Sequence, residues 1–161
     1  FDNLKNPILQ NTIYWELCIS YLSDLLTKKG FLMYLGMKLD LVASRKIIER
    51  KKVFQVAEEI NLLYKDHLAA KMIITHGDEA QALLFPTCSG QLFDLIEEIC
   101  QKMEPVAVRF GFGAGNLTTS LRPEAIGMDG PVWHRAEEAL RLAKKRKGLL
   151  CFPSLALSCL P

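Results

Sequence analysis

The sequence has few features that point to a special environment. Its five cysteines are odd in number and include no Cys-x-x-Cys pair, so neither a disulfide framework nor a zinc knuckle is indicated. A formal net charge of only +2 gives no argument for or against any partner. No apolar run reaches the roughly 20 residues of a membrane span, because Glu16, Asp24, Lys28 and Lys29 interrupt the N-terminal candidate. Because the sequence shows no recognisable signal peptide, we expect a cytoplasmic protein that does not associate with a membrane.

The chain does contain a regular series of helical and strand patterns, and its 161 residues fit one domain. The expected elements are a helix over 8–29, a strand over 31–43, a long amphipathic helix over 46–70, a hairpin over 71–85, a helix after residue 89, a strand over 106–113, a short return strand over 116–121 and a helix over 131–147. This order predicts an α+β fold of ferredoxin-like type, an antiparallel sheet with helices packed on one face.

The strand expected over 106–113 has two unlike faces. Valine and phenylalanine alternate with alanine, arginine and glycine, so one face is apolar and the other is nearly bare of side chains. The apolar face is expected to be core. On the bare face, a ligand or a helix can approach the backbone closely.

Acidic residues stand at two predicted strand ends. Asp40 ends the first strand, and Asp78 and Glu79 form the tip of the hairpin after Gly77. Two carboxylates on adjacent strand ends can hold a divalent cation against a phosphate, since Mg²⁺ prefers oxygen ligands and completes its shell with phosphates and water. The other interpretation is that they only cap a strand and a polar turn.

Five blocks of the sequence resemble the bacterial SatD family. They are Asp40-Leu41-Val42-Ala43-Ser44-Arg45, Gln55 with Asn61, Gly77-Asp78-Glu79-Ala80-Gln81, Arg109-Phe110-Gly111-Phe112-Gly113, and Ala125-Ile126-Gly127-Met128-Asp129-Gly130-Pro131 with His134. The resemblance implies a domain over 33–148. It leaves 1–32 as an N-terminal helical extension and 149–161 as an apolar tail that begins with a short strand.

The SatD pattern is in turn similar to a reduced class III nucleotidyl cyclase or diguanylate cyclase palm domain. That likeness implies Asp40 and Asp78 as ligands of Mg²⁺ or Mn²⁺, and a nucleotide or another phosphorylated small molecule as the bound partner. Seven further residues are candidates for contacts with the ligand or its phosphates: Ser44, Arg45, Glu79, Gln81, Arg109, Asp129 and His134. For Ser44 and Arg45 a helix cap, and for Glu79 and Gln81 an exposed polar strand face, are the open alternatives.

The sequence departs from cyclases where an asparagine and an arginine would stabilise the transition state. His134 and Glu138 stand at those places, and a carboxylate has the wrong charge for that role, so the sequence leans against an enzyme. We therefore expect a sensor or regulator that binds its ligand with a metal. The alternatives are a nucleic-acid or protein interaction module without a metal site and an active nucleotidyltransferase. The basic run 144–147 supports nucleic acid only weakly, because it also complements the helix dipole, and a homodimer is compatible with the sequence.

Overall fold

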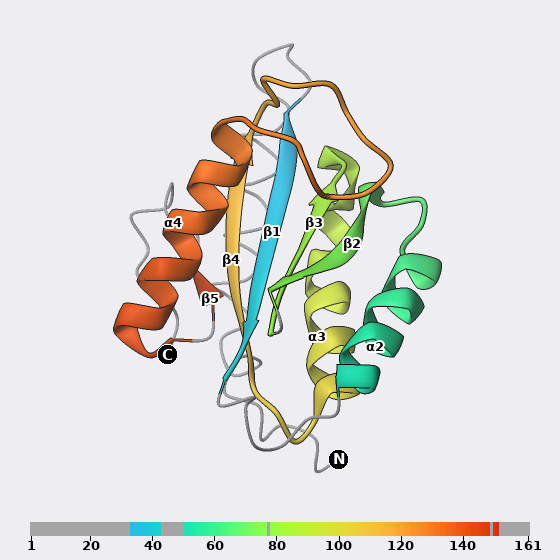
Figure 1. Ribbon diagram of the computed structural model, residues 1–161, viewed down its shortest axis with the longest axis vertical. Helices are drawn as coiled ribbons and strands as arrows, with labels where there is room; N and C mark the ends of the chain where they lie inside the picture. The colour runs from blue at the N-terminus through green and yellow to red at the C-terminus, as the bar shows by residue number, and fades with distance from the viewer. Residues whose placement is uncertain (1–32, 43–49, 77, 149, 152–161) are drawn as a thin grey trace.

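A computed structural model describes residues 33–42, 50–76, 78–148 and 150–151 (Figure 1). Its elements, in chain order, are β1 (Tyr34–Leu41), α2 (Arg50–Leu63), β2 (Leu68–His76), β3 (Glu79–Leu84), the 3₁₀ helix η2 (Pro86–Gln91), α3 (Leu92–Met103), β4 (Val108–Gly115), α4 (Pro131–Arg146) and β5 (Leu150–Cys151). The predicted long helix, hairpin, following helix and glycine-containing strand are all present. The expected helix over 8–29 lies outside the described residues.

The sheet has β1 at its centre. The strand order is β2-β3-β1-β4-β5, and β1 pairs antiparallel with both β3 and β4. Strand β5 adds a short parallel pair to β4, as expected for the start of the tail. A strand, helix, hairpin, helix, strand series with this order is the ferredoxin-like arrangement, so the predicted fold class is confirmed.

One face of the sheet carries the main hydrophobic core, against α2 and α3. Every second residue of β1 and β4 points into it, including Leu35, Met37, Phe110 and Phe112, which are at most 1% exposed. Helix α3 contributes a stripe of buried residues at helical spacing, Leu92, Ile96, Ile99 and Met103. The alternation along β4 therefore identified the core face correctly.

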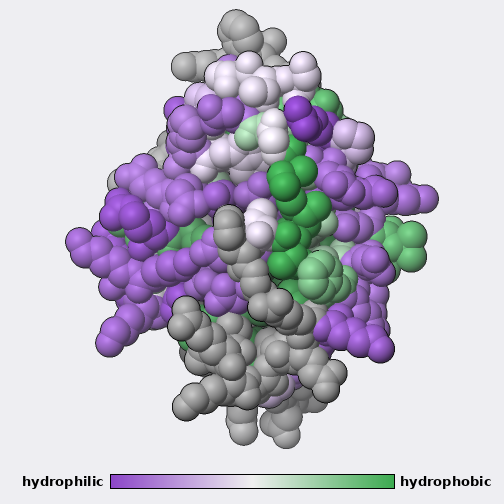
Figure 2. Space-filling model, in the orientation of Figure 1, coloured by the Kyte–Doolittle hydropathy of each residue, from purple (hydrophilic) through white to green (hydrophobic). Residues whose placement is uncertain are grey.

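Helix α4 packs on the opposite face of the sheet. The prediction that all helices pack on one face therefore holds for α2 and α3 but not for α4. The bare face of β4 makes this possible. A Cβ added to Gly111 would lie 2.3 Å from the amide nitrogen of Leu140, and one added to Gly113 would lie 2.3 Å from that of Ala136. Only glycine allows so close an approach of helix to strand. Figure 2 shows hydrophilic residues over α4 and a narrow hydrophobic band right of the centre of this face.

The segment between β4 and α4 forms no strand, so the return strand predicted over 116–121 is wrong. The segment instead runs back to the edge of the sheet, where Lys71 of β2 donates its backbone N–H to Pro123 and accepts from Ala125. A single bridge to a remote strand leaves no local pattern in the sequence. None of the helices in the described part of the chain has the length and hydropathy of a membrane span.

Candidate functional site

Asp40 is the one charged residue that is buried among those the structure describes, at 8% exposed. It lies next to the last residue of the central strand, on the face that α4 covers. Placing a carboxylate there removes it from water, which is costly unless charged or hydrogen-bonding partners compensate. The surroundings of Asp40 therefore define the site.

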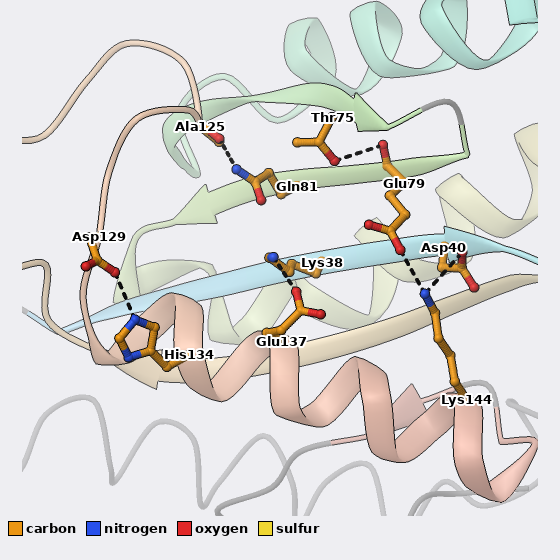
Figure 3. Close-up of polar contacts among 10 residues, drawn as sticks. All are labelled: Lys38, Asp40, Thr75, Glu79, Gln81, Ala125, Asp129, His134, Glu137 and Lys144. Atoms are coloured by element: carbon orange, nitrogen blue, oxygen red, sulfur yellow. Dashed lines mark hydrogen bonds and ion pairs between the residues drawn. The ribbon is translucent and has the colours of Figure 1, made fainter.

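Two cations from different elements contact Asp40. Arg109 is its cross-strand neighbour on β4, and the guanidinium donates to Oδ2 at 3.1 Å. Lys144, in the last turn of α4, places Nζ 3.5 Å from Oδ1. The glycines of β4 hold α4 against the sheet with its C-terminal end over this carboxylate (Figure 3).

The hairpin brings further acidic residues to the same place. Glu79 is the cross-strand neighbour of Asp40 on β3 and accepts from Lys144 Nζ at 2.8 Å. The backbone carbonyl of Asp78 accepts from the N–H of Leu41 at 3.1 Å, which joins the hairpin tip to the end of β1. The prediction that the two strand ends meet is thus confirmed for the backbone.

Burial raises the pKa of Asp40 above the ordinary value of 3.8. The charges of Lys144 and Arg109 oppose this shift, and the charge of Asp78 adds to it. Burial alone would lower the pKa of Lys144, but the hydrogen bond to Glu79 and the charge of Asp40 leave it raised. For Asp40, burial thus outweighs the effect of the two cations that contact the carboxylate.

Three of the predicted ligand contacts, Gln81, Asp129 and His134, make their polar contacts away from Asp40 and Lys144. His134 Nε2 pairs with Asp129 Oδ1 at 2.9 Å, and both side chains are largely exposed. Ten residues separate His134 from Lys144, or about 15 Å along the helix, and Figure 3 shows the two at opposite ends of the drawn group. Gln81 donates to the carbonyl of Ala125 in the connecting segment.

Ser44 and Arg45 lie outside the described residues, so their expected role remains a prediction. Arg109 is present at the site but is committed to internal partners, since it also donates from Nε to the carbonyl of Gly148 at 3.2 Å. Lys144 was not predicted as a site residue, because it stands in the basic run 144–147. A signal was available, because Lys144 continues the four-residue spacing of Ala136 and Leu140, the row that contacts the β4 glycines.

The donor set has the chemistry of a site for a hard divalent cation, but only in part. Asp40, Asp78 and Glu79 offer carboxylate oxygens, which Mg²⁺ and Mn²⁺ prefer. Within the described ranges, however, no three histidine, cysteine or acidic side chains are grouped so that they could hold a metal ion. Such a cation would need one or two of these carboxylates together with ligand phosphates and water. It would also compete with Lys144, which now contacts Asp40 and Glu79.

The fold and the charged centre define an α+β domain with a ferredoxin-like sheet and a polar site at the end of its central strand. The model of the SatD family matches residues 34–149, and the chain belongs to that family. It is also similar to the crystal structure of the guanylyl cyclase Cya2, with 12% sequence identity and a TM-score of 0.42 over 68% of this chain and 69% of that one. No curated protein matches the chain.

Proposed function

We propose that this SatD-family domain binds a nucleotide or another phosphorylated ligand, together with a divalent cation, and acts as a sensor or regulator. The observation that supports the proposal best is the buried Asp40, which lies between the acidic hairpin tip and two cations. A carboxylate perturbed by burial and by specific charged neighbours is typical of functional sites. A purely structural contact between α4 and the sheet would not need it.

The balance of charge favours a cationic partner at this position. Asp40, Asp78 and Glu79 contribute −3 and Arg109 and Lys144 contribute +2, which leaves a formal −1. A phosphorylated ligand alone would increase this deficit of positive charge. A divalent cation held by Asp40 and Asp78 would reverse it and would supply positive charge to the phosphates. Ser44 and Arg45, at the start of the segment after β1, remain the predicted phosphate contacts.

A role in binding accords better with α4 than a role in cyclisation. The position expected to hold a transition-state arginine is Glu138, which is exposed on α4. The buried positions of this helix are apolar; its polar contacts with the sheet include the ion pairs of Glu137 and Lys144 and a hydrogen bond from Arg135 to the carbonyl of Ala114. We therefore expect ATP or GTP with Mn²⁺ to yield no cyclic product above background.

The test is a thermal-shift and calorimetric screen of nucleotides with and without Mg²⁺ or Mn²⁺. A ligand at about 100 times its Kd should add about 2.7 kcal/mol to the free energy of unfolding. Asp40→Asn and Asp78→Asn should each abolish the divalent-dependent part. Asp94 is an exposed residue of α3, on the other face of the sheet. Asp94→Asn should therefore bind like the wild type and serves as the control.

Three results would point elsewhere. Unchanged binding in both Asp40→Asn and Asp78→Asn would show that the site is wrong. Binding of RNA or DNA that is indifferent to these substitutions would favour the interaction-module alternative. Product formation from ATP or GTP that is lost in Asp78→Asn would establish a nucleotidyltransferase instead of a sensor.

A further inference from the structure

The ammonium of Lys144 lies between the acidic residues Asp40 of β1 and Glu79 of β3, where a bound cation could also lie. Its ammonium lies 2.8 Å from Glu79 Oε1 and 3.5 Å from Asp40 Oδ1. Lys144 therefore joins the end of β1 to the start of β3. Asp40 thus has one oxygen facing Lys144 and the other facing Arg109.

The two cations differ in how firmly they are held. Arg109 comes from the start of β4, with its side chain only 15% exposed and a second hydrogen bond to the carbonyl of Gly148. Lys144 comes from the last turn of α4, and its side chain is 38% exposed. A flexible four-carbon stem lets an ammonium move into solvent without any change in the helix. Arg109 is therefore the fixed counter-charge and Lys144 the displaceable one.

We propose that Lys144 is a built-in competitor of the divalent cation: its ammonium contacts Asp40 and Glu79, and it must leave Asp40 before that carboxylate can bind the cation together with Asp78. This rests on the proposed function, because it concerns the cation that the phosphorylated ligand would need. Lys144 then determines how much divalent cation is needed to load the site. Binding of the divalent cation would also move the positive charge of Lys144 away from the sheet to the exposed side of α4.

In the direct experiment, MnCl₂ alone is titrated into the wild-type protein and three variants, and binding is measured by isothermal titration calorimetry. Lys144→Gln should bind Mn²⁺ about tenfold more tightly than the wild type, since the metal no longer has to break a charge-assisted hydrogen bond. Lys145→Gln is the matched control, an exposed lysine one residue along the same helix, and should bind like the wild type. Lys144→Gln combined with Asp40→Asn should lose the gain.

A second measurement follows the wild-type lysine itself. Acylation of lysines, quantified by peptide mass spectrometry, should increase at Lys144 when Mn²⁺ is added and remain constant at Lys145. Lys144→Met, which keeps the aliphatic stem, covers the case in which the glutamine variant does not fold. Equal Mn²⁺ affinity in the wild type and both Lys144 variants would overturn the inference, as would an unchanged acylation rate.

The outcome for Lys144 is separable from that of the proposed function. If nucleotides with Mn²⁺ stabilise the protein but the Lys144 variants bind Mn²⁺ no better, only the competitor role is overturned. If the Lys144 variants bind Mn²⁺ more tightly but no phosphorylated ligand adds stability, the competitor role is supported and the proposed function fails. If no variant binds Mn²⁺ at all, the competitor role is overturned.

Discussion

The contact between α4 and β4 gives a sharp prediction for Gly113→Ala. The added Cβ would lie 2.3 Å from the amide nitrogen of Ala136, 2.6 Å from the carbonyl oxygen of Val132 and 2.8 Å from the carbonyl carbon of Arg135. All three are backbone atoms, so no side chain can rotate away. Ordinary contacts begin at 3.4 Å, so relief of the closest contact alone requires 3.4 − 2.3 = 1.1 Å of movement by the helix.

The cost of this movement should be large for a single methyl group. Overpacking typically costs 1–3 kcal/mol, and a clash with helix backbone belongs at the upper end, so we expect a loss of about 3 kcal/mol. For a domain of this size the melting temperature should fall by on the order of 10 °C. Urea unfolding monitored by circular dichroism measures the loss. Gly90→Ala is the control, because no heavy atom lies within 4 Å of the added Cβ. Stabilities of the two variants within about 0.5 kcal/mol of each other would refute the close packing of α4.

Three further predictions concern other parts of the domain. Asn61→Ala removes two part-buried hydrogen bonds, from Nδ2 to the Met72 carbonyl at 2.9 Å and from the Met72 N–H to Oδ1 at 2.7 Å, and should cost about 1–3 kcal/mol in urea unfolding; Asn61→Asp should lie between it and the wild type. Burial, complete for Cys88 and partial for Cys100, raises the pKa of both thiols to about 11. Iodoacetamide at neutral pH should therefore modify both slowly until the protein is unfolded, and rapid modification of the native protein would contradict the raised pKa values. Burial raises the folded-state pKa of Asp40 above 3.8, so the native state binds a proton more tightly than the unfolded state. Between the raised pKa and pH 3.8, the contribution of this group to stability therefore increases as the pH falls. The free energy of unfolding of the wild type should rise relative to that of Asp40→Asn over this range, and a constant difference would contradict the shift.

Much of the core could be predicted from local patterns. The two-residue alternation along β4 and the helical spacing along α3 each report burial directly, because one buried face imposes its own period on the sequence. The acidic strand ends were also predictable from local sequence: Asp40 ends a run that is apolar except for Lys38, and Asp78 and Glu79 follow a glycine at a turn. The backbone hydrogen bond from the N–H of Leu41 to the carbonyl of Asp78 confirms that these strand ends meet.

Features that depend on contacts between distant segments were not predictable in this way. The glycines of β4 indicated that something approaches closely, but not that it is α4 on the second face. The expected return strand is a loop held by Lys71, a partner more than forty residues earlier in the chain. Lys144 looked like its three basic neighbours because the sequence alone does not show which side of a helix meets a charged strand.

The seating of α4 on β4 also limits how the length of the chain can vary between relatives. Gly115, Gly113 and Gly111 face Val132, Ala136 and Leu140 in turn, so two residues of strand, about 6.8 Å, are matched to four residues of helix, about 6.0 Å. A single residue inserted in this part of α4 would rotate every later position by about 100° and replace small buried side chains with polar ones. Lys144 would turn away from Asp40 in the same step. The segment before Pro131 has no such helix-to-strand match and is held by separate contacts, such as the bridge to Lys71, so we expect gain or loss of residues to be better tolerated there than between Val132 and Lys144.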